Sequence, residues 1–589
     1  MRGFFTKRSV WLSLMATLLI VAGFSAYLTA GAHSTKAAPG ADVHHAKAEP
    51  NLAKPGDNTP LARNFNGTLK NGGDPGDDDT SPSPTLSALC QSFLGQPNPY
   101  SNPAPNVDQI VNDATVPVGS QTGCGTPQNE TTIVVNPGNP NNLVAGTNDY
   151  RFLNTRENRV DGSGLAYTSF DGGATWVNVV LPHLTFQTGA TGALSDMDSA
   201  GDPAVAFGPD NTVYYANLVF SRLNNGSGVV VSISHDGGLT WSEPSIVRLD
   251  GVDANGNPLP TGVFNDKEWV AVDPNNANIA YVTWTTFLDD GTSPVVVSKT
   301  TNGGASWSAA VEIDPLSGFT PGGITPFSSG TYPLVDKHGN LYVAYETAVC
   351  QTLNCNQSTD HDEVVVAKST DGGATFTNSQ VSLDFDFPFN PDVGRETLTN
   401  ENFRINSFPS AAIDRVTGRL YVTWADDRNG QYDANGASIK TNGDVFVSTS
   451  ADGIHWSHEV YQIGTADDEV YPAIGAYNGR VVTSFYTRHY DPNGINLDMG
   501  WAGSNGLGNL QHASVHRITT QSENPDVQFV GIGAVTGNIL QGVFIGDYTA
   551  VALGSDLKFH PCWTDFRGNP NVANDTPNQD AYSQAIRFP

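Results

Sequence analysis

Apolar residues occupy alternate positions in short runs from about residue 123 to the end of the chain. Runs such as TVYYANLVF, PVVVSKT and EVVVAKS are separated by turn sequences such as GPDN, DPNN, HGN and VTG. A period of two predicts strands with one buried face, and the turn sequences between the runs predict hairpins. We therefore expect an all-β protein built from many short strands.

These strands recur in units, and each unit begins with a similar segment that we interpret as an inner strand. Seven such segments occur, namely TTIVVNP, DPAVAFGPD, EWVAVDPNN, YPLVDKHG, PSAAIDRVTG, YPAIGAYNG and IGDYTAVALG. Units of four strands are typical of propeller blades, and a propeller must close on itself to hide its strand edges. The last unit lacks a fourth strand, which a segment within Asp108 to Val118 could supply. We predict a seven-bladed β-propeller of four-stranded antiparallel blades over residues 123–589, with six blades as the alternative if one unit is only an extension.

A short box follows the third strand of five units: SFDGGATW, SHDGGLTW, TTNGGASW, STDGGATF and the shortened SADGIHW. An aspartate after a strand can accept hydrogen bonds from the turn's N–H groups, and the glycines supply positive φ. The final aromatic residue would pack on the neighbouring blade, so the box needs no ligand to explain it. The structural positions of the box are Asp171, Asp236, Asn302, Asp371 and Asp452.

These boxes are similar to the aspartate-box motif of bacterial neuraminidase repeats, and the chain from Cys124 onward resembles the sialidase-like propeller superfamily. For a sialidase, the resemblance implies three arginines that bind a sugar carboxylate, a tyrosine nucleophile activated by a glutamate, and an aspartate acid/base. The family's Arg-Ile-Pro tripeptide ahead of the first box does not occur here. The nearest sequence is FRIN, at 403–406.

Catalytic candidates follow from this resemblance and from their place in the predicted blades. The starts of inner strands and the ends of second strands should meet at one end of the central channel. Tyr548 opens the last blade, as the family's tyrosine does, and Glu346 precedes the later arginines in chain order. Asp202 is the acid/base candidate, although Asp-Pro is also a common turn. Tyr471 is an alternative to Tyr548, but Tyr332 fills the same place in another unit, which suggests a strand opener.

The substrate-binding candidates, besides Tyr471, are arginines: Arg404, Arg428, Arg488 and Arg567. Arg428 and Arg567 end a D-x-R sequence that Arg151 shares at the same blade position. A feature repeated from blade to blade favours a structural interpretation, with ion pairs between neighbouring blades. Arg404 and Arg488 lack this repeat.

Charge and the N-terminal segment limit the partners and the compartment. The chain has 29 basic and 59 acidic residues, a net charge of −30, which disfavours nucleic acid and anionic lipid as ligands. Arg2, Lys7 and Arg8 precede a long apolar run, which predicts a signal peptide or signal anchor over 1–32. Residues 33–122, rich in Pro, Gly, Asn and Asp, are predicted to be a disordered spacer. We expect an extracellular protein, secreted or tethered to the outer face of the membrane.

The cysteines of an exported chain suggest disulfides. Cys350 and Cys355 could pair locally. Two of Cys90, Cys124 and Cys562 could also pair, and a bond between Cys124 and Cys562 would tie together the two ends of the folded region. No CxxC or HExxH sequence occurs, so no cofactor or metal site is expected. The sequence DGVDANGNP at 250–258 is better explained as a long turn than as an EF-hand loop, although calcium in other acidic loops stays open.

Two functions remain from the sequence. The first is a monomeric, secreted sialidase-like glycoside hydrolase acting on an extracellular glycan or glycoconjugate. The alternative is a non-catalytic propeller that binds carbohydrate or protein at the cell surface. Insertions at 383–404 and 489–509 differ from the other units and favour the enzyme, because loops that vary between repeats are where such scaffolds place function.

Overall fold

The computed structural model describes most of the predicted propeller and little of the chain before it. The predicted signal segment lies outside the described residues, as does nearly all of the predicted spacer. No helix in the described part is long and apolar enough to cross a membrane. The described residues are 45–47, 109–110, 128–154, 156, 159–315, 323–352, 360–390, 395–433, 437–457, 459–505, 510, 513–525, 544–567 and 579–588.

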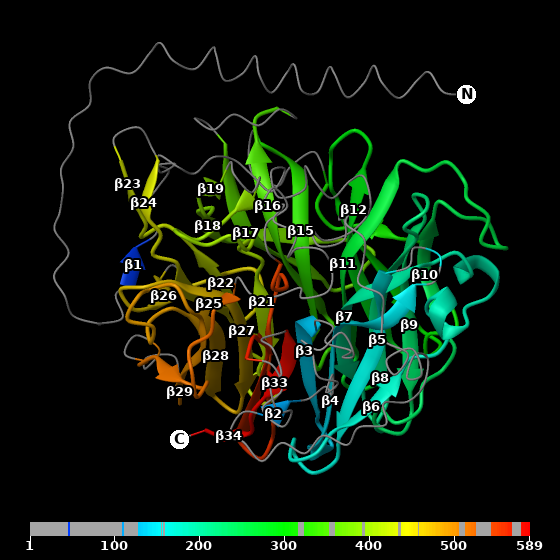
Figure 1. The fold of residues 1–589 in the computed structure, drawn as a ribbon, viewed down its shortest axis with the longest axis horizontal. Helices are drawn as coiled ribbons and strands as arrows, with labels where there is room; N and C mark the ends of the chain where they lie inside the picture. The colour runs from blue at the N-terminus through cyan, green and yellow to red at the C-terminus, as the bar shows by residue number, and fades with distance from the viewer. Residues whose placement is uncertain are drawn as a thin grey trace. The chain divides into compact units, whose positions relative to one another are not determined.

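Seven antiparallel sheets, the blades, follow one another along the chain, as the sequence predicts (Figure 1). Blade 1 contains β3 (Gln128–Asn136), β4 (Asn139–Asn154), β5 (Arg159–Ser169) and β6 (Val177–Val180); blade 2 contains β7 (Ser199–Phe207), β8 (Val213–Phe220), β9 (Ser227–Ser234) and β10 (Ser245–Asp250). Blade 3 contains β11 (Val263–Val272), β12 (Ala280–Leu288), β13 (Val295–Thr300) and β14 (Val311–Glu312); blade 4 contains β15 (Ile324–Val335), β16 (Leu341–Cys350), β17 (His361–Ser369) and β18 (Thr377–Asp384).

The remaining three blades carry the additions to the basic pattern. Blade 5 contains β21 (Ser410–Ile413), β22 (Leu420–Asp426), β25 (Asp444–Ser450) and β26 (Glu459–Ile463), with β1 (His45–Lys47) on its outer edge. Blade 6 contains β27 (Glu469–Tyr477), β28 (Arg480–Thr487), β29 (Asp498–Ser504) and β30 (His516–Arg517). Blade 7 contains β31 (Ala550–Leu553), β32 (Lys558–Asp565) and β33 (Asp580–Ser583), and β34 (Ile586–Arg587) also pairs with β32. Two small hairpins, β19 (Phe389–Asn390) with β20 (Arg395–Glu396) and β23 (Gln431–Tyr432) with β24 (Ser438–Lys440), lie outside the blades.

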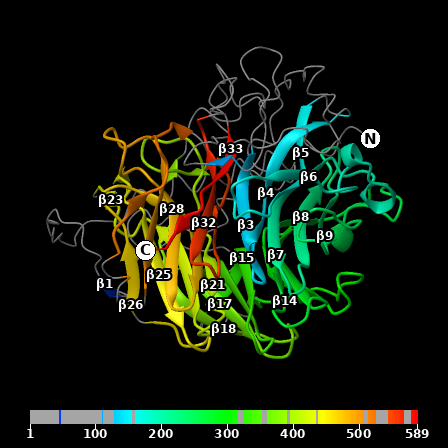
Figure 2. The same cartoon turned by 90° about the horizontal axis from the view of Figure 1, so that it is seen from below.

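The ring is closed by a strand from the N-terminal side, as predicted. β2 (Gln109–Ile110) pairs with β33 as the outer strand of blade 7, with Gln109 opposite Ser583. A hydrophobic cluster fills each space between successive blades, and one of these joins Ile133 of blade 1 to Cys562 of blade 7. The C-terminal strands, red in Figure 2, therefore lie beside the N-terminal strands in blue. Closure pairs the outer edge of β33 with β2 and packs the last blade against the first, which stabilises this fold.

The boxes have the predicted geometry. In blade 1, the Thr175 N–H and hydroxyl donate to the Asp171 carboxylate at 2.8 and 2.7 Å, and Gly172 and Gly173 have φ of 75° and 87°. Trp176 is buried in the cluster between blades 7 and 1. The same carboxylate or amide bonds recur at Asp236, Asn302, Asp371 and Asp452. The boxes are thus part of the framework.

One disulfide prediction is wrong, and the other can be checked at only one of its two cysteines. Cys562 is a free, buried cysteine of β32, so the predicted Cys124–Cys562 bond does not form. Burial raises the pKa of its thiol to about 12, which makes the thiol unreactive. Cys350 is disulfide-bonded, and its predicted partner Cys355 lies outside the described residues.

Candidate functional site

Five of the inner strands begin with a β-bulge at the same position of the blade. The bulged residues have left-handed backbone angles, and the register of each strand with its neighbour shifts there. Such φ values are uncommon outside glycine, and a bulge re-aims the side chain that it carries. The bulged residues and their φ are Glu130 at 54°, Asp202 at 48°, Lys267 at 53°, Gly330 at 65° and Tyr471 at 51°.

In the two other blades, Phe408 and Tyr548 occupy the same place in the sequence of the unit. These seven positions gather at one end of the central channel, which we call the mouth. Part of the mouth encloses a cavity of about 40 Å³, lined by five of the seven residues and by the residues that follow them. One position of the repeat, bulged in five blades, thus brings residues of six types to the same end of the channel.

One side of the mouth is charged. Lys267 Nζ lies 2.8 Å from Asp202 Oδ2, 2.8 Å from Asp547 Oδ2 and 3.3 Å from Glu130 Oε1. Arg404 reaches the same group from the segment before blade 5, and its Nε donates to Asp547 Oδ1 at 2.7 Å. All five side chains are buried, so their charges interact in a medium of low polarity. The cluster joins blades 1, 2, 3 and 7 at the channel axis.

The other side of the mouth is aromatic. Trp269 lies between Tyr332 and Tyr548, with ring centroids 4.7 and 5.2 Å away. Phe408 packs on Gly330 so closely that an added Cβ would lie 2.5 Å from the ring, which explains why glycine is required there. Trp269, Tyr332, Phe408 and Tyr548 are only partly buried and line the cavity. A ligand at the mouth would meet carboxylates on one side and flat apolar rings on the other.

The carboxyl groups of the mouth differ in their affinity for protons. Burial alone would raise the pKa of Asp547, but Arg404 and Lys267 hold that pKa well below its usual range. Burial raises the pKa of Asp266 to about 7, with Lys267 opposing and Asp202 adding to the rise. Burial and Asp202 also raise the pKa of Glu268 well above its usual range. Neither carboxylate oxygen of Glu268 is hydrogen-bonded by another described residue. Neighbouring carboxyls with separated pKa values are typical of acid–base sites.

Four of the predicted site residues meet at the mouth. Asp202 and Arg404 belong to the charged cluster, and Tyr548 lines the cavity. The Tyr471 hydroxyl donates a hydrogen bond to the Arg404 carbonyl oxygen at 2.6 Å. Tyr471 therefore helps to position Arg404, in addition to lying near the start of its inner strand. Burial, together with Glu130 and Asp202, raises the pKa of Tyr548 well above 10, so its phenol is neutral.

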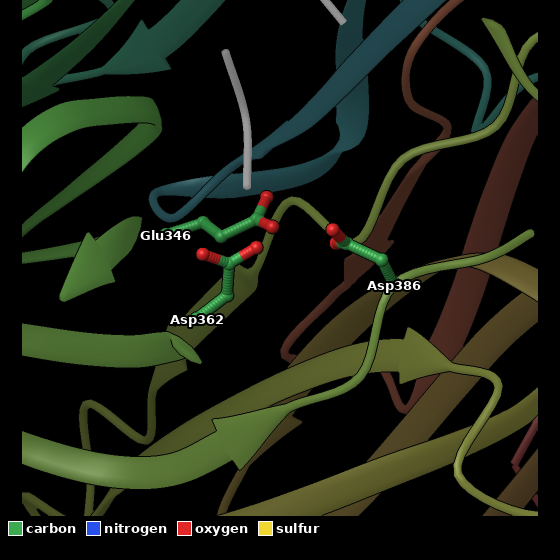
Figure 3. Close-up of side chains that lie close together, drawn as sticks. All are labelled: Glu346, Asp362 and Asp386. Atoms are coloured by element: carbon green, nitrogen blue, oxygen red, sulfur yellow. The ribbon is translucent and has the colours of Figure 1, made fainter. Parts of the chain in front are cut away.

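Glu346 is not part of this group. It lies in blade 4, where its carboxylate and those of Asp362 and Asp386 point toward one another (Figure 3). Burial, followed by Asp386 and Glu396, raises its pKa well above the usual range, whereas the acidic neighbours of Tyr548 are Glu130, Asp202 and Glu268. The expectation that Glu346 activates Tyr548 is therefore not supported by its position, and Glu130 and Glu268 are the glutamates near that tyrosine.

The other predicted arginines form buried ion pairs where the second strands end, a region that we call the rim. Arg428 pairs with Asp426 and donates to the Leu383 carbonyl of blade 4 at 2.9 Å. Arg567 pairs with Asp565 at 2.7 Å and with Glu523, before blade 7, at 2.9 Å. These contacts to the preceding blade are the ones expected from the structural interpretation of D-x-R. The side chain of Arg151 lies outside the described residues.

Arg488 and Arg222 complete the rim without a D-x-R sequence. Arg488 lies 2.8 Å from both Asp468 and Glu401. Arg222 pairs with Asp161 of blade 1 at 2.5 Å. Since each rim arginine has its own carboxylate partners, the structure does not gather Arg404, Arg428, Arg488 and Arg567 around a common ligand.

Sequence reasoning missed Glu130 and Lys267 at the mouth. Both stand directly before the inner-strand segments, in QNETTIVV and NDKEWVAV. The signal was present: at that one position the seven units carry two acids, a lysine, a glycine and three aromatics. Such variation at a fixed backbone position is unlike the rest of the repeat.

The seven closed blades define the class as a seven-bladed β-propeller, and five of its blades carry an aspartate box. A scan against models of known protein families found no match, and neither did a search of curated protein sequences.

Solved structures with a similar fold include a protein of unknown function from Dyadobacter fermentans, with 14% identity, 66% of this chain and 95% of that chain covered, and a TM-score of 0.38. The Hadza microbial sialidase Hz136 has 12% identity, coverage of 76% of this chain and 73% of its own, and a TM-score of 0.38. An α-L-arabinanase from Penicillium chrysogenum, complexed with arabinobiose, has 13% identity, coverage of 71% and 99%, and a TM-score of 0.39. Similarity at this level concerns the fold and not the chemistry of the mouth.

Proposed function

We propose that the protein is a secreted glycoside hydrolase that acts on extracellular glycans at the mouth of its propeller. One observation carries this proposal: carboxyl groups whose pKa values are pushed apart lie beside an aromatic wall at the channel axis. Hydrolysis of a glycosidic bond needs a protonated acid next to an ionised group that stabilises or attacks the sugar.

The residues of the charged side suit these two roles. Glu268 and Asp266 would keep a proton near neutral pH and can donate it to the leaving oxygen. Asp547 stays ionised beside Lys267 and Arg404, and would stabilise positive charge that develops on the sugar ring. In the alternative with a tyrosine nucleophile, Tyr548 would attack the sugar and pass its proton to Glu130 or Asp202, the neighbouring carboxylates that pair with Lys267. Glu268 would then donate its own proton to the leaving oxygen.

A neutral sugar suits this site better than a sialic acid. Recognition of a sugar carboxylate calls for arginines with free donors, and Arg404 already binds Asp547 through two nitrogens. The rim arginines likewise have their own carboxylate partners. The aromatic side, with Trp269 and Tyr332, would pack against the apolar face of a sugar ring.

A second candidate is a non-catalytic glycan-binding propeller, favoured by the size of the cavity. About 40 Å³ holds a few water molecules and is far below the several hundred Å³ of a pocket that encloses a ligand. A glycan would then rest on the mouth instead of entering it.

Turnover of 4-methylumbelliferyl glycosides tests the proposal and separates the two candidates. We expect release of 4-methylumbelliferone from a neutral furanoside or pyranoside, with little from a sialoside. Glu268→Gln should lower kcat by about 100-fold or more, because the residue can no longer supply a proton. Tyr548→Phe should lower kcat only if the tyrosine is the nucleophile. Turnover of the sialoside alone would contradict the preference for neutral sugars, and binding of oligosaccharides without turnover would favour the second candidate.

A further inference from the structure

Strand pairing in blade 4 brings three acidic side chains to one face of one sheet. Asp362 of β17 stands directly opposite Asp384 of β18 and, on its other side, opposite Ala348 of β16. Glu346 is two residues from Ala348 along β16, so its side chain points to the same face. Glu346, Asp362 and Asp384 therefore share a face at the end of this sheet.

Asp386 adds a fourth carboxylate from the segment that follows β18. One oxygen from each of Glu346, Asp362 and Asp386 lies within 4.8 Å of the others, and Figure 3 shows the three groups facing a common point. Asp384 lies beside this group, because its strand pairing places it opposite Asp362 on the same face. Four acids from three strands and one loop thus converge.

Two of these carboxylates have a buried oxygen that no described residue hydrogen-bonds. These atoms are Oε2 of Glu346 and Oδ2 of Asp384, and both residues are only 1% exposed. The other oxygen of Asp384 accepts the Phe385 N–H at 2.9 Å. A buried oxygen without a partner is costly, and native proteins usually satisfy such atoms with protein groups, water or an ion.

One described cation near this group, Arg428, does not neutralise it. Its guanidinium donates from two nitrogens to Asp426 and from one to the Leu383 carbonyl. When the four converging carboxylates are ionised, their charge exceeds that of one arginine engaged in this way, and a bound cation would supply the difference.

We propose that Glu346, Asp362, Asp384 and Asp386 form a calcium site in blade 4. The donors are all oxygens, which excludes the nitrogen and sulfur sets that zinc favours. Ca²⁺ binds oxygens at about 2.3–2.6 Å, so that ligands on opposite sides are roughly 4.6–5.2 Å apart, whereas Mg²⁺ at about 2.0–2.1 Å needs roughly 4.0–4.2 Å. The ligand oxygens of Glu346, Asp362 and Asp386 all lie within 4.8 Å of one another, so one ion could reach all three, and this many carboxylates exceeds the one or two that Mg²⁺ usually takes.

A cation at this point would fasten the insertion between blades 4 and 5. Asp386 stands near the start of that insertion, and Arg404 and Phe408, at its far end, reach the mouth. The start of the insertion also contacts blade 5, because the Phe385 carbonyl accepts a hydrogen bond from the Asp427 N–H at 3.0 Å. The site would therefore tie blade 4 to the segment that delivers Arg404.

Calorimetric titration of the full chain with CaCl₂, after treatment with EDTA, tests the site without relying on any activity. We expect one Ca²⁺ per chain, with Mg²⁺ binding at least tenfold more weakly. Asp386→Asn should weaken Ca²⁺ binding at least tenfold, and this residue is partly exposed, so the variant should fold. The control is Asp253→Asn, which alters the exposed acidic turn at 250–258, where Asp253 already accepts the N–H groups of Asn255 and Asn257.

Thermal unfolding with and without Ca²⁺ gives a second, independent measure of binding. Ca²⁺ should raise the melting temperature of the wild type and of Asp253→Asn, but not of Asp386→Asn or Glu346→Gln. Absence of Ca²⁺ binding to the wild type would overturn the proposal. So would undiminished binding to Asp386→Asn, or loss of binding in Asp253→Asn alone.

Discussion

The rim and the mouth of this propeller both consist of buried ion pairs, yet their residues are distributed differently. At the rim, an arginine after the second strand contacts the preceding blade, at Arg222 and Arg428, or a segment between blades that lies earlier in the chain, at Arg488 and Arg567. At the mouth, the backbone repeats but the side chains do not, and one lysine serves three carboxylates. The rim repeats a residue type, whereas the mouth repeats only a position.

This difference separates architecture from function. A contact that every blade needs in order to pack on its neighbour should recur with the same chemistry. A site for one ligand cannot have the symmetry of the ring, so it must use different side chains at equivalent positions. The strained backbone of Glu130, Asp202, Lys267 and Tyr471 supports the same view, because such strain gathers at functional sites.

The largest effect on stability should come from the rim. Arg222→Met leaves Asp161 buried without its partner, since the two side chains are 4% and 0% exposed. We expect a loss of about 3–5 kcal/mol in the free energy of unfolding, measured by urea denaturation. Arg248→Met is the matched control: its pair with Asp250 is 47% and 15% exposed, and its loss should stay below about 1 kcal/mol. Equal losses would show that the rim pairs do not hold the blades together.

The next effect is a pH dependence that belongs to the mouth. Burial raises the pKa of Asp266 to about 7 in the folded protein, whereas an unfolded aspartate has a pKa of about 3.9. At pH values between these two, the folded state therefore binds more protons than the unfolded state. Stability should therefore fall as pH rises from about 4 to 7, by about 1.4 kcal/mol per pH unit from this group.

Asp266→Asn should remove that part of the slope when urea unfolding is compared at pH 5 and pH 7. Asp253→Asn should leave the slope between these two pH values unchanged, because hydrogen bonds from Asn257 lower the pKa of Asp253 and its carboxyl is ionised at both. An unchanged slope in Asp266→Asn would mean that the carboxyl is ionised throughout, and the proposed acid would then be Glu268 alone.

Gly330→Ala tests the repeated bulge itself. The substitution combines a left-handed φ of 65° with a clash against Phe408 and should cost about 1–3 kcal/mol. Gly291→Ala has a φ of 89° and open space around it, so only the backbone penalty of about 1 kcal/mol applies. Indistinguishable melting temperatures for the two variants would show that Phe408 is free to move away from the mouth.

The smallest effect is expected at a box. Asp236→Asn should change the free energy of unfolding by less than about 0.5 kcal/mol, because Asn302 already makes the corresponding bond to Ser306 in blade 3. Asp236→Ala removes the acceptor of the Thr240 N–H and hydroxyl and should cost about 1 kcal/mol. A large loss for Asp236→Asn would mean that the box needs its charge.

Much of the fold could be predicted from the sequence, because strand period, turns and boxes are local and repeat seven times. Even closure by the strand at Gln109 follows from the missing outer strand of the last unit. Part of the site could also be predicted, since Asp202, Tyr548 and Arg404 lie at strand starts or carry the family resemblance. Glu346 was predicted to act beside Tyr548 from its order in the chain, but order does not fix distance. Its side chain instead lies beside Asp362 and Asp386 at blade 4. Lys267 was missed because its role depends on three partners from other blades. Asp202 and Glu130 lie 65 and 137 residues earlier in the chain, and Asp547 lies 280 residues later.

The turnover of one 4-methylumbelliferyl glycoside by Glu268→Gln and by Arg222→Met, expressed per folded molecule, tests most directly whether function lies at the mouth. We predict that Glu268→Gln loses at least about 100-fold in kcat while keeping its stability, and that Arg222→Met keeps kcat while losing stability. Equal turnover by Glu268→Gln and the wild type would contradict the account.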